Sequence, residues 1–351
     1  MAEEAGAARV RGPLAELTLA RIRELTREPE AVFWVFVFPI LLAAILGLAF
    51  RSRPPEALPI AVVAGPHADA RMAALAADRD LKPRLLSEAE ARQALARGHV
   101  VLVVSDGEPP IYSFDPTQPE SRTARLSVDA ALQRAAGRAD VFTAGGAELT
   151  EPGGRYVDFL VPGLLGMNIM GTGMWGIGFS LVVARNGNLL KRLVAAPVRR
   201  SHLLSAQLVS RIIFLVPEAG ALLLFAHFAL GVPVRGSFAM LTGVSLLGAL
   251  AFSGLGLLTA ARPRTIEGVS GLMNFVMVPM WIFSGIFFST DRFPARLQPF
   301  VHVLPLTALN DCLRAVMLEG AGLAPLLPEL ALLAAWGAIS FAVALKVFRW
   351  Q

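Results

Sequence analysis

Residues 31–50 read AVFWVFVFPILLAAILGLAF, twenty consecutive residues without a charged side chain. A helix needs about 20 apolar residues to cross a hydrocarbon core about 30 Å thick, so this stretch predicts a transmembrane helix. Pro39 lies inside it, and membrane helices tolerate such a kink. Polar and charged residues run up to Glu30, which is too long for the n-region of a signal peptide. We therefore expect the stretch to stay in the bilayer.

Five more apolar stretches follow in the second half of the chain. They cover about Phe159–Ala184, Leu204–Leu230, Phe238–Ala261, Val269–Phe288 and Leu327–Val347. Only 17% of all residues are charged, whereas a soluble domain has about 25%. The sequence thus predicts a polytopic α-helical membrane protein with six transmembrane helices, of which five lie in residues 156–351.

The lysines and arginines predict the orientation of these spans. With the N-terminus inside, the inner segments carry Arg9, Arg11, Arg21, Arg23, Arg27, Arg185, Lys191, Arg192, Arg199, Arg200, Arg262, Arg264, Lys346 and Arg349, and the short outer loops carry Arg235, Arg292, Arg296 and Arg314. Because positive charge accumulates on the cytoplasmic side, we expect both termini in the cytoplasm of a multi-pass protein of the inner (cytoplasmic) membrane. The net charge of +5 does not indicate nucleic-acid binding, since the basic residues flank apolar runs.

The first 30 residues are expected on the cytoplasmic side. Within them, Pro13–Glu28 places leucines and isoleucine on one face of a helix and arginines on the other. This pattern predicts an amphipathic helix on the inner membrane surface. The alternative is a disordered cytoplasmic tail.

Residues 51–155 have the mixed charge of a soluble domain, inserted between the first and second spans. Strands are expected at Leu58–Ala64, near Pro83–Leu86, at His99–Val104 and at Pro110–Phe114, and helices at Ala68–Ala77, Ser87–Ala96 and Glu120–Arg138. Ser87 and Glu90 stand at capping-box spacing. The alternation predicts an α/β domain, which the orientation of the spans places outside the cytoplasm, as an extracytoplasmic domain.

The sequence argues against an enzyme. No Gly-rich phosphate loop follows a strand, and G-x-x-x-x-G-K-[ST] does not occur, so the chain has no ATPase site of its own. It has one cysteine, Cys312, and the five histidines are scattered without metal-ligand spacing. We expect no catalytic residue, no metal site and no directly bound cofactor.

A few polar side chains fall within or at the ends of the spans. Asp158, Glu218 and Glu267 are acidic candidates, and only Glu218 lies deep in a predicted span. An intramembrane acid is by default a functional hypothesis. The alternative is a structural role for Glu218, as partner of Arg211, of an asparagine such as Asn168 or Asn274, or of a second subunit.

Three stretches carry a resemblance to a known family. The first is RNGNLLKRLVAAPVRRSHLL, residues 185–204; the second is EGVSGLMNFVMVPMWIFSGIFFSTDRFP, residues 267–294; the third is LPLTALNDCLRAV, residues 304–316. Their motifs, order and spacing resemble those of permease subunits of ABC transporters of the type-2 export class. The matching positions are Arg185, Leu189, Lys191, Arg192, Leu193 and Pro197, then Pro279, Ser284, Gly285, Phe287, Phe288 and Pro294, then Pro305, Leu306, Asp311 and Arg314. Asn186 and Asn188 depart from the Glu and Gly that are common in the family.

The resemblance implies a dimer, with a homodimer expected, that pairs with two copies of a cytoplasmic ATPase, which binds ATP and Mg²⁺. It assigns a cytoplasmic coupling loop to residues 185–203, including Leu190, and an outer re-entrant segment to residues 289–325. It also implies that the chain exports a substrate. Drugs, lipids, lipid-linked sugars, peptides and ions are all cargo within the class.

The second span is our candidate for lining the path, because methionine adapts to varied apolar cargo. Its Met170 and Met174 stand among glycines, whose alternative role is close helix packing. Two other functions are consistent with many spans. An ion-coupled secondary transporter would depend on Glu218, and a non-transporting membrane receptor or assembly factor would depend on residues 56–150.

Overall fold

The computed structural model describes residues 13–50, 57–140, 142, 153–186, 200–263 and 265–347. The chain forms two compact units, which we call the membrane unit (residues 1–51 and 150–351) and the α/β unit (residues 52–149).

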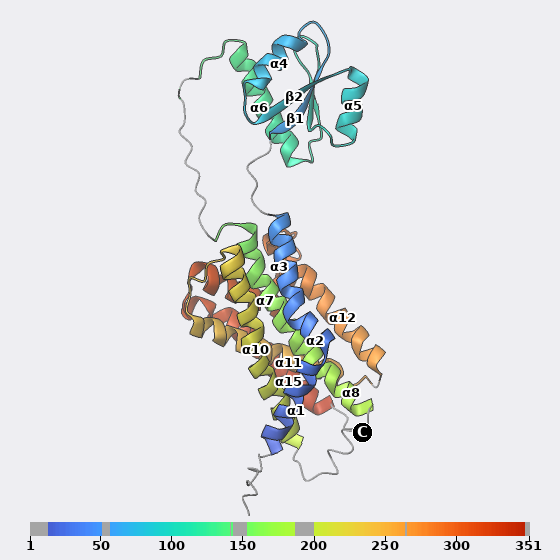
Figure 1. Ribbon diagram of the computed structural model, residues 1–351, viewed down its shortest axis with the longest axis vertical. Helices are drawn as coiled ribbons and strands as arrows, with labels where there is room; N and C mark the ends of the chain where they lie inside the picture. Colours follow the sequence, from blue (N-terminus) through green and yellow to red (C-terminus); the bar gives the residue numbers. More distant parts are fainter. Residues whose placement is uncertain are drawn as a thin grey trace, which may run out of the picture. The chain divides into compact units, whose positions relative to one another are not determined.

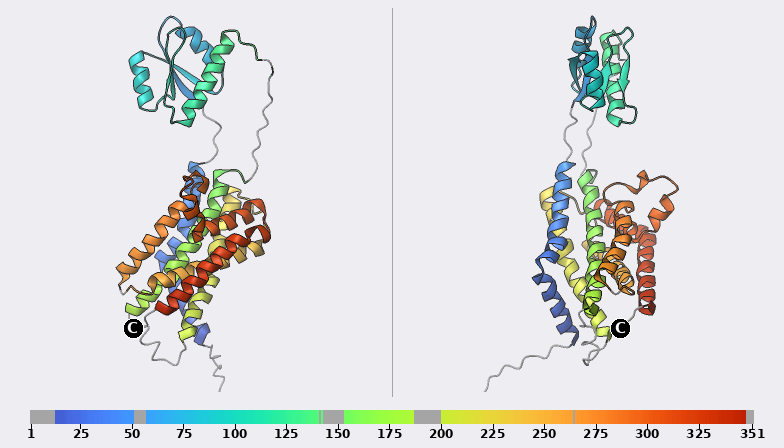
Figure 2. Two further views of the ribbon diagram at one scale, coloured as in Figure 1. Left: turned by 180° about the vertical axis from the view of Figure 1, so that it is seen from behind. Right: turned by 90° about the vertical axis from the view of Figure 1, so that its right-hand side faces the viewer.

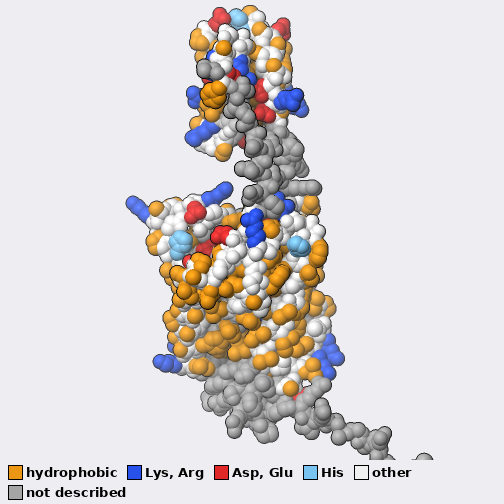
Figure 3. Space-filling model, turned by 90° about the vertical axis from the view of Figure 1, so that its left-hand side faces the viewer, with side chains coloured by type: hydrophobic (Ala, Val, Ile, Leu, Met, Phe, Trp, Pro, Cys, Tyr) orange, Lys and Arg blue, Asp and Glu red, His pale blue; other side chains and the backbone are white. Residues whose placement is uncertain are grey.

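The membrane unit contains six helical segments that are long and apolar enough to cross a bilayer, as the sequence predicted. They are Pro29–Ala49, Tyr156–Val183, Ala206–Leu230, Phe238–Ala260, Ile266–Phe283 and Ala324–Val347. On the face shown in Figure 3, hydrophobic side chains cover the middle of this unit, and lysines and arginines lie toward its ends. The protein is therefore a polytopic helical membrane protein.

Several spans combine regular and irregular helix. The first joins α2 (Pro29–Val32), the π-helical η1 (Phe33–Val37) and α3 (Phe38–Ala49). The second joins α7 (Tyr156–Met174), the π-helical η2 (Trp175–Phe179) and α8 (Ser180–Asn186). The others are α10 (Arg200–Leu230), α11 (Phe238–Ala260), α12 (Ile266–Phe283) and α15 (Leu327–Val347), which follows the 3-10 turn η5 (Ala324–Leu326).

The fifth span is shorter than the sequence suggested. It was expected to reach Phe288, but α12 ends at Phe283 with Ser284 as its C-cap. Gly285 follows with φ +69°, a left-handed conformation that glycine adopts without a Cβ penalty and that stops a helix. The apolar residues beyond it continue the hydrophobic run without continuing the helix.

The second and fourth spans form the centre of the membrane unit. About 78% of the most apolar window of the second span and 67% of that of the fourth are buried, against 17–22% for the other four. In Figure 1, α3 and α10 pack beside α7, whereas α12 lies at one edge of the bundle. Glycines on α7 and α11 make this close packing possible.

The chain between α12 and α15 forms short helices. They are η3 (Thr290–Arg292), α13 (Gln298–Val303), α14 (Pro305–Arg314) and the π-helical η4 (Ala315–Glu319). Eight of the ten residues of α14 are buried, and α14 packs against α7, α11 and α15. This segment is thus part of the bundle core, although no single helix of it is long enough to span a bilayer.

Before the first span lies α1 (Pro13–Arg27), which packs along α10. It ends at Arg27, and Pro29 then starts α2 as a first-turn proline. Figure 2 shows α1 and the first span from two further sides.

The α/β unit contains a four-stranded sheet in the order β2-β1-β3-β4. Its strands are β1 (Leu58–Val63), β2 (Leu81–Leu86), β3 (Leu102–Val104) and β4 (Tyr112–Phe114), and its helices are α4 (Ala68–Ala76), α5 (Glu88–Ala96) and α6 (Pro119–Ala135). β1 pairs in parallel with β2 and β3, and β4 runs antiparallel to β3.

Alternate residues of the inner strands point to two small cores. Ile60, Val62, Leu102 and Val104 face α4 and α6, whereas Ala61 and Val103 face α5. This division follows from the period of two along a strand. The third strand starts later than the expected His99, because the N–H groups of His99 and Val100 both donate to the carbonyl of Ala94 at the end of α5.

Candidate functional site

The predicted coupling loop lies mostly outside the described residues, which break off after Asn186 at the end of α8 and resume at Arg200. Leu189, Leu190, Lys191, Arg192, Leu193 and Pro197 all fall in this gap. Arg185 is described, and its Nη1 donates to the carbonyl oxygen of Pro263 over 2.9 Å. Pro263 belongs to the connection between α11 and α12, so the start of the loop is tied to the start of the fifth span.

Glu218 lies in a buried polar cluster inside the third span. Its side chain is fully buried, and Oε2 lies 2.6 Å from Nη1 of Arg211, itself 7% exposed. Oε1 lies 3.0 Å from the hydroxyl of Thr172 on α7. The geometry therefore matches the structural alternative, in which Glu218 is the partner of Arg211, and it gives no support to ion-coupled transport.

Asn168 connects the second span to the first. Its Nδ2 donates to the carbonyl of Val35 over 3.0 Å, and Val35 lies in η1, where the regular α-helical pairing is interrupted. Polar side chains between transmembrane helices commonly satisfy such carbonyls. Asn168 is buried, so it positions the first span on α7.

The side chains of Met170 and Met174 are buried inside a single copy of the protein. Both have no exposed surface and belong to the hydrophobic core of the membrane unit. The partly exposed face of the second span instead carries Thr172, Trp175 and Phe179. In the single chain the two methionines thus take part in helix packing, the alternative role considered for the glycines around them.

Asp158 stabilises the beginning of α7. Its Oδ1 lies 2.7 Å from Nη2 of Arg155, and its Oδ2 accepts from the backbone N–H groups of Gly153 and Arg155. The same Nη2 also donates to the carbonyl of Gly231 after α10. Every one of these contacts is a capping contact or joins two helix ends.

The polar residues of α12 lie on its exposed side. Glu267 and Asn274 are exposed, as is Phe275 at 76%. The buried side is a stripe of Val269, Met273, Met277 and Met280. Asn274 is thus an exposed polar side chain about halfway along an apolar span.

In the segment between α12 and α15, Arg314 is the central residue. The expected pair with Asp311 is present at 3.6 Å. The guanidinium of Arg314 also lies 3.8 Å from the ring centre of Phe159 on α7, and its Nη2 donates to the carbonyl of Gly285. Pro305 starts α14 in its first turn.

Asn310 is a residue that the sequence reasoning missed. Its side chain is fully buried, and Nδ2 donates to the carbonyl of Ser284 over 2.8 Å. A Cβ at Gly166 would collide with Oδ1 of Asn310, so a larger residue there would require the Asn310 side chain to move. The feature that could have indicated a buried role for Asn310 is its position between two short apolar runs that contain leucine.

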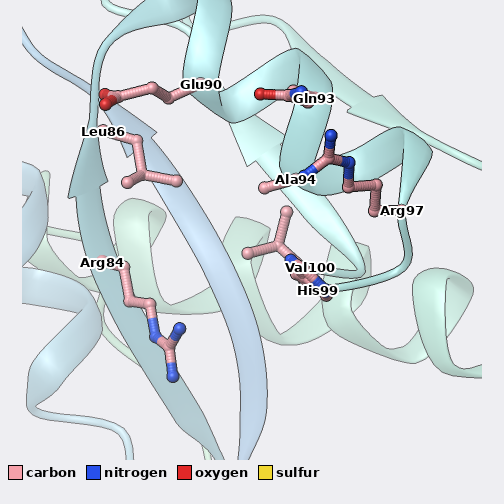
Figure 4. A pocket seen from close by; sticks show the side chains of 8 residues that line it. All are labelled: Arg84, Leu86, Glu90, Gln93, Ala94, Arg97, His99 and Val100. Carbon is pink, nitrogen blue, oxygen red and sulfur yellow. The ribbon is translucent and has the colours of Figure 1, made fainter.

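Neither a metal centre nor a catalytic constellation emerges in the described parts of the chain. Their histidines, cysteine and carboxylates form no group of three that could hold an ion. A shallow cavity of about 220 Å³ lies between α5 and β2 of the α/β unit. Figure 4 shows Arg84, Arg97 and His99 around it, with Leu86, Ala94 and Val100 among its lining; these side chains form no arrangement for acid–base or nucleophilic chemistry.

Six apolar helices, four of them packed around the glycine-rich pair formed by the second and fourth spans, define a multi-pass membrane protein. The chain belongs to the ABC-2 family of transporter proteins, whose family model matches residues 30–346. The resemblance noted from the three sequence stretches is thereby confirmed, and the chain is an ABC-2-type permease.

Two bacterial relatives of the chain are named as permeases. The linearmycin resistance permease protein LnrN of Bacillus subtilis is 28% identical over 58% of this chain and 51% of its own length. The probable multidrug ABC transporter permease YbhS of Escherichia coli is 28% identical over 46% of this chain and 43% of its own. ABC transporter G family member 20 of Dictyostelium discoideum is 29% identical over 49% of this chain. The chain spans about half the length of the bacterial relatives and 24% of the Dictyostelium protein.

Proposed function

We propose that this chain is the membrane-spanning subunit of an ABC exporter that moves its substrate outward with ATP hydrolysed by a separate partner ATPase. The observation that carries this proposal is the position of the basic segment 187–199. It connects the end of the most buried span to the start of α10, and Arg185 beside it is bonded to the α11–α12 connection. A partner acting on this segment would move three helices together.

The partners follow from the same proposal. Two copies of the cytoplasmic ATPase bind ATP and Mg²⁺, and each docks on Leu189, Leu190, Lys191, Arg192, Leu193 and Pro197 with Arg185 and Asn186 beside them. A second copy of the permease forms a homodimer. The exposed side of α12, with Asn274 inside an apolar span, supports such a contact.

The orientation rests on charge. Arginines and lysines concentrate in the segments next to the N-terminus, in 185–200 and in 262–264, which favours a cytoplasmic location for them and for both termini. The α/β unit then lies outside the cytoplasm, and α1 lies at the inner membrane surface. The segment around Arg314 forms the outer end of the pathway.

The substrate is an amphiphilic or apolar molecule in this proposal. The partly exposed face of the second span carries Trp175 and Phe179, and the exposed side of α12 carries Leu272, Phe275 and Val278. Relatives include proteins named for linearmycin resistance and for multidrug transport, which agrees with a cargo recognised by apolar contact.

The test is charge reversal of Lys191→Glu with Arg192→Glu, since both charges lie on the proposed docking segment. We expect the variant to reach the membrane in normal amounts but to lose ATPase association in co-purification and to lose transport into inverted vesicles. The matched control is Arg292→Glu with Arg296→Glu, two exposed arginines of the α12–α15 segment, which should retain ATPase association. Full association of the Lys191/Arg192 variant would contradict the docking assignment.

A further inference from the structure

The second and third spans are the two helices that leave the 187–199 segment, and both are irregular inside the membrane. α10 contains Pro217, which lacks the N–H for a helical hydrogen bond and weakens the helix at that turn. The second span contains the π-helix η2, a rare form that loosens the regular pattern. A force applied at 187–199 would therefore be absorbed by bending unless these places are held.

Polar contacts cross between the two helices on both sides of the weak places. Thr172 precedes η2, and its hydroxyl lies 3.0 Å from Oε1 of Glu218, the residue after Pro217. Ser180 follows η2, and its hydroxyl donates to Oε1 of Gln207 over 3.3 Å. Each half of α10 is thus attached to the matching half of the second span.

The pair Arg211–Glu218 adds a contact along α10 itself. The two residues are two turns apart on one helix, and their 2.6 Å ion pair reaches across the turn that contains Pro217. A salt bridge in a buried setting holds its geometry well, because water does not compete for it. It links residues on either side of Pro217, the position at which one backbone hydrogen bond of the helix is missing.

The Arg211–Glu218 pair is not expected to add much to the free energy of folding. Replacing a buried ion pair with apolar residues of similar size is often neutral or stabilising. Within the described residues, Nε and Nη2 of Arg211 are buried without a hydrogen-bond partner, which is unfavourable. A role in geometry accounts for the pair better than a role in the free energy of folding.

We propose that Arg211, Glu218 and Thr172 are positioning residues that brace the third span at Pro217, so that a displacement at 187–199 reaches the far half of α10 and of α7. Gln207 and Ser180 complete the brace on the near side. This inference rests on the proposed function only for the claim that a partner ATPase acts at 187–199.

The brace can be tested by distance measurement on the full chain in lipid nanodiscs. Spin labels at Val209→Cys and Phe228→Cys, both exposed at 37% and 79%, flank Pro217 in a Cys312→Ala background. The sites are 19 residues apart, about 28 Å along a helix. We expect a narrow distance distribution in the parent and a broad one in Arg211→Met with Glu218→Leu, which removes both charges together and so avoids an unpaired buried charge.

The decisive variant adds Pro217→Ala to that double substitution. A continuous backbone no longer needs the ion pair, so the distribution should become narrow again. The single variant Pro217→Ala should keep a narrow distance distribution between the two labels. The proposal would be wrong if the distance distribution stayed narrow in Arg211→Met with Glu218→Leu. It would also be wrong if the distribution became broad and adding Pro217→Ala did not narrow it.

The second readout is transport per ATP hydrolysed in proteoliposomes with the partner ATPase. The double variant should keep its ATPase activity and lose transport per ATP roughly tenfold, the size of an ordinary coupling between sites, and Pro217→Ala should restore it. If the parent chain neither binds the ATPase nor transports, the proposed function fails while the distance result still decides the brace. If transport is coupled in every variant, the brace fails while the proposed function stands.

Discussion

At single residues, the packing of the membrane unit depends on glycines where two helix backbones meet. A Cβ at Gly256 of α11 would lie 2.8 Å from Cα and 2.9 Å from the carbonyl oxygen of Met174. Backbone atoms cannot move aside as a flexible side chain can. Gly243 on the same helix has nothing within 4 Å of such a Cβ, so the two positions separate the steric effect from the effect of helix propensity.

We expect Gly256→Ala to destabilise the protein by about 1–3 kcal/mol, the usual cost of overpacking. Gly243→Ala should be neutral or stabilising by up to about 1 kcal/mol, because alanine favours a helix over glycine. Thermal unfolding of the two purified variants in the same detergent measures the difference. Equal melting temperatures would contradict the close approach of α7 and α11.

Pairs of interacting side chains could be predicted from the sequence, whereas hydrogen bonds from side chains to backbone carbonyl oxygens could not. The spacings of Asp311 with Arg314 and of Arg211 with Glu218 place each pair on one helix face, and both pairs are present. The contacts Asn168–Val35, Arg185–Pro263 and Asn310–Ser284 join residues distant in sequence to carbonyl oxygens. Since every residue has a carbonyl, nothing in the sequence marks which one is used.

At the scale of elements, length and hydrophobicity predicted the spans but not their neighbours. All six apolar runs contain a span helix, since an apolar helix needs no particular partner to be stable in lipid. Which helices become central depends on which glycines meet another backbone, and Gly243 and Gly256 look alike in the sequence. The strand near Pro83 was placed too late, because β2 starts at Leu81 and the charged residues Lys82 and Arg84 interrupt its apolar pattern.

α12 offers a prediction about the second copy. Its two sides differ, with Met277 buried at 1% and Asn274 exposed. In a Cys312→Ala background, Asn274→Cys should form a cross-linked dimer with a short bifunctional maleimide in native membranes, because the proposed homodimer contact uses this side. Met277→Cys on the same helix should not cross-link. A chain that stays monomeric at both positions would contradict a dimer formed through α12.

At the scale of the whole molecule, the chain combines two units with separate hydrophobic cores. The strands and helices of the α/β unit bury their own apolar residues on both faces of the sheet. A domain with its own core can fold without the rest of the chain. We expect residues 52–149, expressed alone, to be soluble and to unfold in a single cooperative transition in urea, as followed by far-UV circular dichroism. A gradual loss of signal would show that the unit depends on the membrane unit.

Tyr112 gives an independent check on the fold of this excised unit, because it is the only tyrosine between residues 52 and 149 and no tryptophan lies there. Burial, followed by the charge of Asp129 and the hydrogen bond to it over 3.3 Å, raises the pKa of Tyr112 above its ordinary value, against a smaller opposite effect of Arg71 and Arg125. Ultraviolet titration should therefore show the phenolate forming at higher pH in buffer than in urea, where the pKa is about 10.

Because the pKa of Tyr112 is higher in the folded state, its contribution to stability is complete below pH about 10 and is lost as the pH rises through the folded value. Asp129→Asn should move the titration back toward the value in urea, and identical titrations in buffer and in urea would mean that β4 does not pack under α6 as the structure shows.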